Sequence, residues 1–211
     1  MKYLKTLALA AVAAAALLAV VGAGTASATT VICGTKGSIQ SPNPCPAGVH
    51  EKEWPANEPI LATATGPKLV TNLLTVECTS STATVTPEGN TEATIKGKAN
   101  VSFTGCFIAG SPTSKCEVTI ENAPYSGSVT GTIGGVTGKS ELVVNKPRAK
   151  VKCGSFINCT YEQASVSLEG TNGSGSTNFV ADESLGHVAG LICPSTSTWE
   201  ATYNTSEVTI H

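Results

Sequence analysis

The densest cluster of polar side chains that could do chemistry is residues 50–54, with the sequence His-Glu-Lys-Glu-Trp. Glu51 and Glu53 beside His50 could serve sugar hydrolysis or hold a metal ion. The zinc motif His-Glu-x-x-His is not completed, because position 54 is Trp. Closely spaced carboxylates are also typical of a solvated loop, and this is the interpretation that we favour.

A second candidate is Asp182, the single Asp of the chain, with His187 five residues later. A hydrolytic triad needs a nucleophile, a base and an orienting carboxylate. The Gly-x-Ser-x-Gly nucleophile motif does not occur, and the chain has only three histidines. We therefore expect no enzyme and assign no catalytic residue, cofactor or metal, while a secreted hydrolase of carbohydrate or ester substrates stays as an alternative.

A run of alternating cations could bind an anion. Lys146, Arg148, Lys150 and Lys152 occupy every second position of a strand-like segment. Their spacing predicts one exposed strand face. Such a face can simply be solvated and discourage edge pairing. The sharper hypothesis is contact with an anionic partner such as a cell-wall polymer.

Eight cysteines form the most informative set. An even number predicts four disulfides if the chain is exported to an oxidising compartment. Metal binding is not favoured, because no two cysteines lie closer than six positions. Short intervals rich in turn residues predict three local pairs, which leaves two cysteines for a long-range bridge. The predicted pairs are Cys33–Cys45, Cys106–Cys116, Cys153–Cys159 and Cys78–Cys193.

The first 28 residues have the pattern of a secretory signal peptide. Lys2 and Lys5 precede an apolar run over residues 7–21, and a small-x-small sequence ends at Ala28. The run is shorter than the roughly 20 residues that span a bilayer. We expect cleavage after Ala28 and a mature protein that is secreted, or held at the cell surface, without a membrane span.

Composition excludes several classes of protein. Of 211 residues, 13% are charged, and the formal net charge is −2. This argues against binding to nucleic acid driven by charge and against a coiled coil. Frequent Val, Ile, Leu and Ala at low charge argue against disorder.

A period of two dominates the mature chain. From 92 to 105, the odd positions include Ile95, Ala99 and Val101, and the even positions include Lys96 and Lys98. Short runs of this kind, separated by Gly, Pro and Asn clusters, predict an antiparallel β-sandwich, with a β-barrel as the alternative. We expect one domain over residues 29–211. Its first part, residues 29–59, contains five prolines and is expected to be irregular.

Several short motifs resemble a known group of proteins. They are Cys45-Pro46, Trp54-Pro55-Ala56, Val76-Glu77-Cys78, Phe103-Thr104-Gly105-Cys106, Cys193-Pro194 and Trp199-Glu200-Ala201-Thr202-Tyr203. With the Ala-rich leader, the chain resembles exported, cysteine-containing bacterial proteins of the high-GC Gram-positive type, whose function is unknown. The resemblance implies a disulfide-bonded all-β domain and carries over no catalytic or binding residue.

These features predict a secreted, disulfide-stabilised β-domain with a binding role or a structural role in the cell envelope. A cell-wall polymer or a surface protein is the expected partner, and the ligand and the oligomeric state stay open. A small-molecule carrier or an inhibitor of the same fold is a further alternative. A hydrolase requires convergence of the His50 cluster, or of Asp182 and His187, in one cleft, whereas a carrier requires a deep apolar pocket between sheets.

Overall fold

The computed structural model describes residues 29–48, 50–131 and 138–211. The predicted signal peptide, residues 1–28, lies outside them. All named elements are β-strands, and all their pairings are antiparallel, which confirms the predicted all-β class. Within the described part, no helix is long and apolar enough to cross a membrane.

The described residues form eighteen strands. They are β1 (Thr30–Gly34), β2 (Lys52–Glu53), β3 (Ile60–Thr65), β4 (Lys68–Val70), β5 (Thr75–Glu77), β6 (Ser80–Pro87), β7 (Thr91–Glu92), β8 (Ile95–Thr104), β9 (Phe107–Ile108), β10 (Ser111–Ile120), β11 (Tyr125–Gly131), β12 (Lys139–Asn145), β13 (Arg148–Cys153), β14 (Ile157–Glu162), β15 (Ser165–Asn172), β16 (Thr177–Ala189), β17 (Thr196–Thr205) and β18 (Val208–Ile210).

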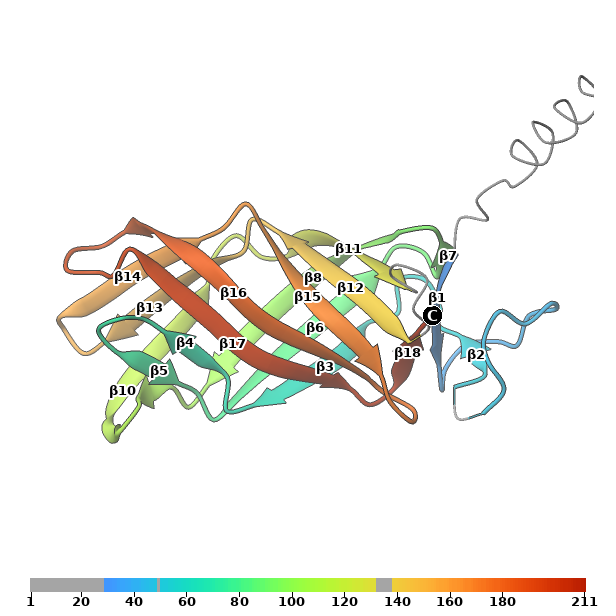
Figure 1. Cartoon of the computed structure of the whole chain (residues 1–211), viewed down its shortest axis with the longest axis horizontal. Coiled ribbons are helices and arrows are strands. Elements are labelled where there is room, and N and C mark those ends of the chain that lie inside the picture. Colours follow the sequence, from blue (N-terminus) through green and yellow to red (C-terminus); the bar gives the residue numbers. More distant parts are fainter. Residues whose placement is uncertain (1–28, 49, 132–137) are drawn as a thin grey trace, which may run out of the picture.

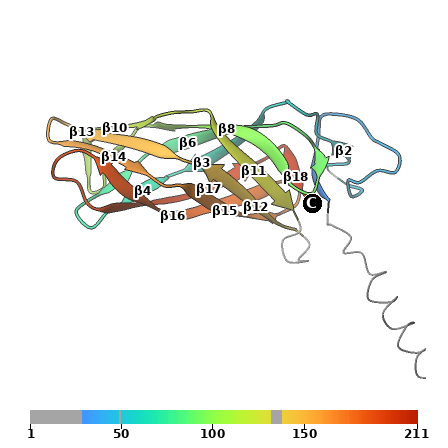
Figure 2. The same ribbon diagram turned by 90° about the horizontal axis from the view of Figure 1, so that it is seen from above.

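The larger sheet is folded into two layers along an elongated molecule. Figures 1 and 2 show β12, β15, β16 and β17 on one side and β6, β8, β10 and β13 on the other. Each strand of the larger sheet pairs with its neighbours in an order that leads back to the first strand. Some of these pairings, however, consist of only one or two residue pairs. A single residue pair connects β3 to β17, and two pairs connect β5 to β9. The long β16–β17 ladder also divides the ring of strands, so the arrangement is a flattened sandwich rather than a regular barrel.

The predicted alternation is confirmed in the strands that carry it. In β8 the even positions are all exposed, while Ile95 and Ala99 are buried. In β17 the side chains of Trp199 and Tyr203 face the core. Alternating burial fixes the register, because a slip by one residue would turn each apolar side chain outward.

Aromatic side chains of β17 bind the two layers together. The ring of Trp199 contacts those of Phe103 and Tyr203 edge to face, at centroid distances of 6.4 and 5.8 Å. The hydroxyl of Tyr203 also lies 2.7 Å from Ser81 Oγ of β6. This buried hydrogen bond satisfies a polar group that would otherwise oppose burial of the tyrosine.

The expectation of an irregular segment over residues 29–59 is wrong for Thr30–Gly34. This segment forms β1, which is buried at every position and pairs with β18, β2 and β7. Its main partner, β18, is close to the C-terminus of the chain. No local sequence pattern therefore indicates that residues 30–34 form a strand. The prolines of residues 42–46 lie instead in the connection between β1 and β2.

All eight cysteines form disulfides, as predicted, but only the Cys33–Cys45 pair is confirmed. The predicted pairs Cys106–Cys116, Cys153–Cys159 and Cys78–Cys193 are wrong. The observed pairs are Cys78–Cys106, Cys116–Cys153 and Cys159–Cys193. Each cysteine therefore pairs with a neighbour in the order of cysteines along the chain.

Strand register explains the correction. Cys116 and Cys153 are direct partners in the β10–β13 ladder. Cys78 and Cys106 continue the β6–β8 register, in which Ser80 faces Thr104. By contrast, Cys153 faces Ile157 in the β13–β14 hairpin and not the nearby Cys159. Disulfides form between residues that the sheet places opposite each other, and separation along the chain is a poor guide.

The pairing predicts a graded loss of stability. The Cys116–Cys153 bridge closes a loop of 37 residues and the Cys33–Cys45 bridge a loop of 12. Loop-closure entropy then gives costs of about 4 kcal/mol and about 3 kcal/mol for their removal. Urea unfolding of the two double Cys→Ala variants measures these costs. A linked Cys106–Cys116 peptide in a digest of unreduced protein would contradict the pairing.

Candidate functional site

The polar side chains of the His50 cluster make hydrogen bonds to neighbouring segments. His50 is buried, and its Nδ1 has no hydrogen-bond partner among the described residues. Glu51 Oε1 accepts the Gly48 N–H at 2.7 Å, and Glu53 Oε2 accepts a hydrogen bond from the Asn90 side chain at 3.3 Å. The two carboxylates are therefore engaged with neighbouring segments rather than paired with each other.

His50 lies near the C-terminal histidine. Burial lowers the pKa of His50. The pKa of His211 is lowered by burial and, in second place, by the positive charge of His50. His211 hydrogen-bonds Thr209, and its backbone pairs with Val31 of β1. The two imidazoles thus lie near the junction of β1 and β18.

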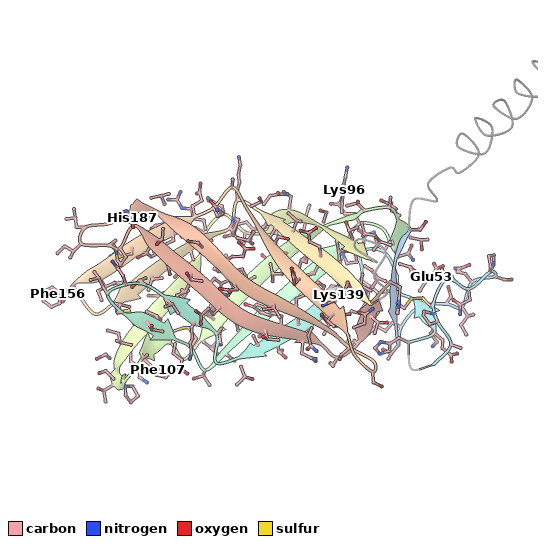
Figure 3. The ribbon with its side chains drawn as sticks, in the orientation of Figure 1. Glu53, Lys96, Phe107, Lys139, Phe156 and His187 are labelled. Atoms are coloured by element: carbon pink, nitrogen blue, oxygen red, sulfur yellow. A yellow bond between two sulfur atoms is a disulfide. The ribbon has the colours of Figure 1, made fainter. Side chains whose placement is uncertain are left out.

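Asp182 and His187 do not converge. Both lie on β16, but five residues apart in a strand, so their side chains point to opposite faces. Asp182 is exposed and faces Glu200 of β17. His187 is half-buried, and its ring packs on Tyr161 at a centroid distance of 6.0 Å. Figure 3 labels His187 and Glu53 toward opposite ends of the molecule, so the two candidate clusters are also apart from each other.

The cationic run is only partly free to meet an anion. Arg148, Lys150 and Lys152 share the outer face of β13, whereas Lys146 lies in the turn before it at a φ of 51°. Arg148 forms ion pairs with Glu121 and Glu162 at 2.8 and 3.1 Å. These carboxylates raise the pKa of Arg148 by accepting its hydrogen bonds.

Carboxylates also lie beside the rest of this strand. Lys152 faces Glu117 across the ladder, and Lys150 faces Thr119. Arg148 and Lys152, on either side of Lys150, therefore both have acidic neighbours. The net charge of this strand face is close to zero. Contact with an anionic polymer stays a prediction.

An acidic groove occupies the outer face of the opposite layer. It encloses about 530 Å³ between β12, β15 and β16, and its walls include Glu141, Glu169, Asp182 and Glu183. Glu141 faces Glu169 directly across the β12–β15 ladder. Like charges in such a pair repel each other, and here Ser167 offsets part of the repulsion by donating hydrogen bonds to Glu141 and, from its backbone, to Glu183.

The most distinctive surface is one end of the sandwich, which we name the apolar end. It consists of the loops 71–74, 109–110, 154–156 and 190–195, which connect β4–β5, β9–β10, β13–β14 and β16–β17. Figure 1 shows these connections at the end opposite β1 and β2. Phe156, Leu191 and Ile192 are 88%, 85% and 88% exposed there, and Leu73 is also exposed. None of the four loops contains a charged residue.

Disulfides constrain the loops of the apolar end, and two residues of these loops have positive φ angles. Cys153 and Cys159 flank the Phe156 loop, and Cys193 lies inside the loop that carries Leu191 and Ile192. Ile192 has a φ of 60°, a conformation that branched side chains strongly disfavour. Gly190, at a φ of 117°, approaches the Asn158 carbonyl so closely that a Cβ would clash with it.

A pocket opens among these loops, and we name it the end pocket. It has a volume of about 160 Å³. Its lining consists of Leu69, Thr71, Leu73, Leu74, Val76, Val151, Ile157, Cys159, Tyr161, Ile192, Pro194 and Ser197. Burial raises the pKa of Tyr161, which keeps its hydroxyl neutral. Ser197 is 1% exposed, and its Oγ finds no hydrogen-bond partner in the described ranges.

The interior of the sandwich holds a smaller apolar cavity. Its volume is about 60 Å³, and side chains of both layers line it, among them Ala62, Ala83, Leu168 and Phe179. Pockets that enclose a drug-sized ligand measure about 300–1,000 Å³. This cavity is too small for such a ligand, so it does not supply the deep pocket that a carrier would need.

No family model, no curated protein and no solved structure matches the chain. Functional conclusions therefore depend on the chain's own residues. Sequence reasoning missed the apolar end, although a signal was present: adjacent large apolar residues, such as Leu73-Leu74 and Leu191-Ile192, stand in segments otherwise made of turn residues. No sequence pattern indicated that the Ser197 hydroxyl lacks a hydrogen-bond partner, because this depends on tertiary packing.

The two histidines predict a pH-dependent stability. Their folded-state pKa values are depressed, so below about pH 6.5 the unfolded chain binds more protons than the folded chain. Their contribution is complete above that pH and is lost as the pH falls toward the folded-state values. The free energy of unfolding should therefore fall as the pH is lowered from 7.5 to 5.5, and this fall should be smaller in the His50→Gln/His211→Gln variant. An equal slope in both proteins would contradict this assignment.

Proposed function

We propose that this protein is an exported protein-binding domain that docks through its apolar end. The observation that carries the proposal is the near-complete exposure of Phe156, Leu191 and Ile192 on disulfide-held loops. Large apolar side chains gathered at one place on a protein surface mark an interaction site. Scattered exposure of single residues would need no such explanation.

The geometry of the loops supports binding rather than incidental exposure. A branched residue in the left-handed region costs about 1–3 kcal/mol, and such strain is concentrated at functional positions. Ile192 has this conformation beside the Cys159–Cys193 bridge. Loops that are ordered before binding lose less entropy on association. The disulfides therefore reduce the conformational entropy that these loops lose when a partner binds.

Charge favours a protein partner over an anionic membrane. Exposed Lys115 and Lys152 lie near the apolar end, but Glu77 and Glu117 accompany them. An anionic lipid surface attracts clusters of cations, and this end has no net excess of them. Uncharged Ser, Thr, Asn and Gly accompany the apolar residues in these four loops, and protein interfaces likewise combine apolar side chains with uncharged polar ones.

Two further considerations support this proposal. Four disulfides suit an oxidising, extracellular location, in agreement with the predicted signal peptide. A hydrolase is less favoured, because Asp182 and His187 point to opposite faces of β16 and His50 belongs to the distant strand junction.

Binding of fluorescently labelled protein to intact cells of the source organism tests the proposal. The wild type should bind saturably, and the Phe156→Ser/Ile192→Asn variant should bind about tenfold more weakly or worse, because interface anchors dominate affinity. Asn tolerates a positive φ, so the variant should keep its stability. The matched control is Leu61→Ser/Val180→Ser, which removes two exposed apolar side chains of β3 and β16 and should bind normally.

Protease treatment of the cells identifies the class of partner. Loss of binding after treatment supports a protein partner. Equal binding to treated cells, or to vesicles of phosphatidylglycerol and phosphatidylcholine, would overturn it. Equal weakening by the end variant and the control variant would overturn the assignment of the docking surface.

A further inference from the structure

The chain contains one Asn-Gly sequence, and it lies where β15 ends. Of the eleven asparagines, Asn172 alone precedes a glycine. The backbone nitrogen that follows an asparagine can attack the side-chain amide, and glycine favours this attack because it has no Cβ to crowd the approach. The attack expels ammonia and forms a succinimide, which water opens to an aspartate or an isoaspartate. By its sequence, Asn172 is therefore the asparagine most prone to deamidation.

The side-chain amide of Asn172 connects the β15–β16 hairpin to β18. Its Nδ2 donates to the Ile210 carbonyl at 2.6 Å, and its Oδ1 accepts the Ile210 N–H at 3.2 Å. His211 and Val31 exchange backbone hydrogen bonds alongside the β1–β18 ladder, so the backbone groups of Ile210 point away from β1. The amide of Asn172 thus satisfies both backbone groups of Ile210, as a neighbouring strand would.

These hydrogen bonds require an amide at position 172. The buried Thr177 hydroxyl also donates to Asn172 Oδ1, at 2.6 Å, so the oxygen receives two donors while the nitrogen faces the Ile210 carbonyl. An ionised carboxylate has no donor, so one of its oxygens would repel that carbonyl. An isoaspartate also lengthens the backbone and displaces the side chain. Deamidation therefore breaks the connection between the hairpin and β18.

The folded turn restrains the reaction but leaves it accessible. The Gly173 N–H donates to the Ser176 carbonyl at 2.8 Å, and the attacking nitrogen must lose this proton. Gly173 and Ser174 are exposed, so water and base reach the turn. The attack thus requires a local opening that breaks the hydrogen bond between Gly173 and Ser176 and frees the Asn172 amide.

We propose that Asn172 is a deamidation site and that its conversion releases β18 from the β15–β16 hairpin. The side-chain amide and one water become a carboxylic acid and ammonia, and no oxidant, reductant or enzyme takes part. Because β18 pairs with β1, the loss of this contact reaches the junction of these two strands. The turn lies at the end of the molecule that holds β1 and β18 (Figure 1), so the proposal is independent of docking at the apolar end.

Peptide mass spectrometry of the folded protein, after incubation in mildly alkaline buffer, tests the site. The mass increase of deamidation should accumulate at Asn172 before it accumulates at any other asparagine. Gly173→Ala is the matched variant, because a Cβ at this position would come no closer than 3.5 Å to its neighbours. This variant should keep the stability of the wild type and lose most of the deamidation at Asn172.

A second pair of variants tests the structural consequence. Asn172→Asp reproduces the aspartate product, and Asn100→Asp introduces the same change at an exposed position of β8. Asn172→Asp should raise the equilibrium constant of unfolding about tenfold or more, because a hydrogen bond is replaced by a contact between two acceptors. It should also speed hydrogen exchange of the Ile210 amide. Asn100→Asp should change neither quantity.

Three results would overturn the inference. They are earlier deamidation at another asparagine, an equal rate in Gly173→Ala, and an Asn172→Asp variant with the stability and Ile210 exchange of the wild type.

Discussion

Pairing of cysteines across neighbouring strands is the constraint on which the apolar end depends. Three bridges, Cys78–Cys106, Cys116–Cys153 and Cys159–Cys193, join strands that run to this end. Among the ladders at this end, the one between β5 and β9 is short, with two residue pairs. The bridges Cys116–Cys153 and Cys159–Cys193 restrain the loops that carry the exposed Phe156 and Ile192.

The other end of the molecule is held by different means. The buried strand β1 pairs with β18, and Trp54, which is fully buried, donates from its indole nitrogen to the Glu58 carbonyl at 2.9 Å. His50 and His211 lie at the same junction. The two histidines that make the stability depend on pH thus lie at one end of the molecule, and the proposed docking surface lies at the other. The Trp199 and Tyr203 packing between the layers connects them through the core.

The sequence predicted the class of fold better than its connections. The period of two in β8 and β17 identified which side chains are buried, because alternation along a strand directly reflects the two faces of a sheet. Strand β1 and the disulfide partners escaped prediction, since both depend on which strands are neighbours in space. The Ser80–Thr104 register would have placed Cys78 opposite Cys106, but it is known only from the folded sheet.

The candidate sites show the same limit. The sequence placed three of the cations on one strand face correctly, but it could not show that Glu121 and Glu162 bind Arg148. Nor could spacing reveal that Leu73 and Ile192, far apart in the chain, line one pocket. Sites assembled from several loops require the tertiary structure, because their members share no local pattern.

The most direct test of the central claim is the backbone order of the apolar end on the picosecond-to-nanosecond timescale. Nitrogen-15 relaxation gives an order parameter for the amides of Phe156, Leu191 and Ile192. Loops held by disulfides should have values of about 0.85, like the strands of the core. Values below about 0.6 would mean that these loops sample many conformations, and would contradict a preorganised binding surface.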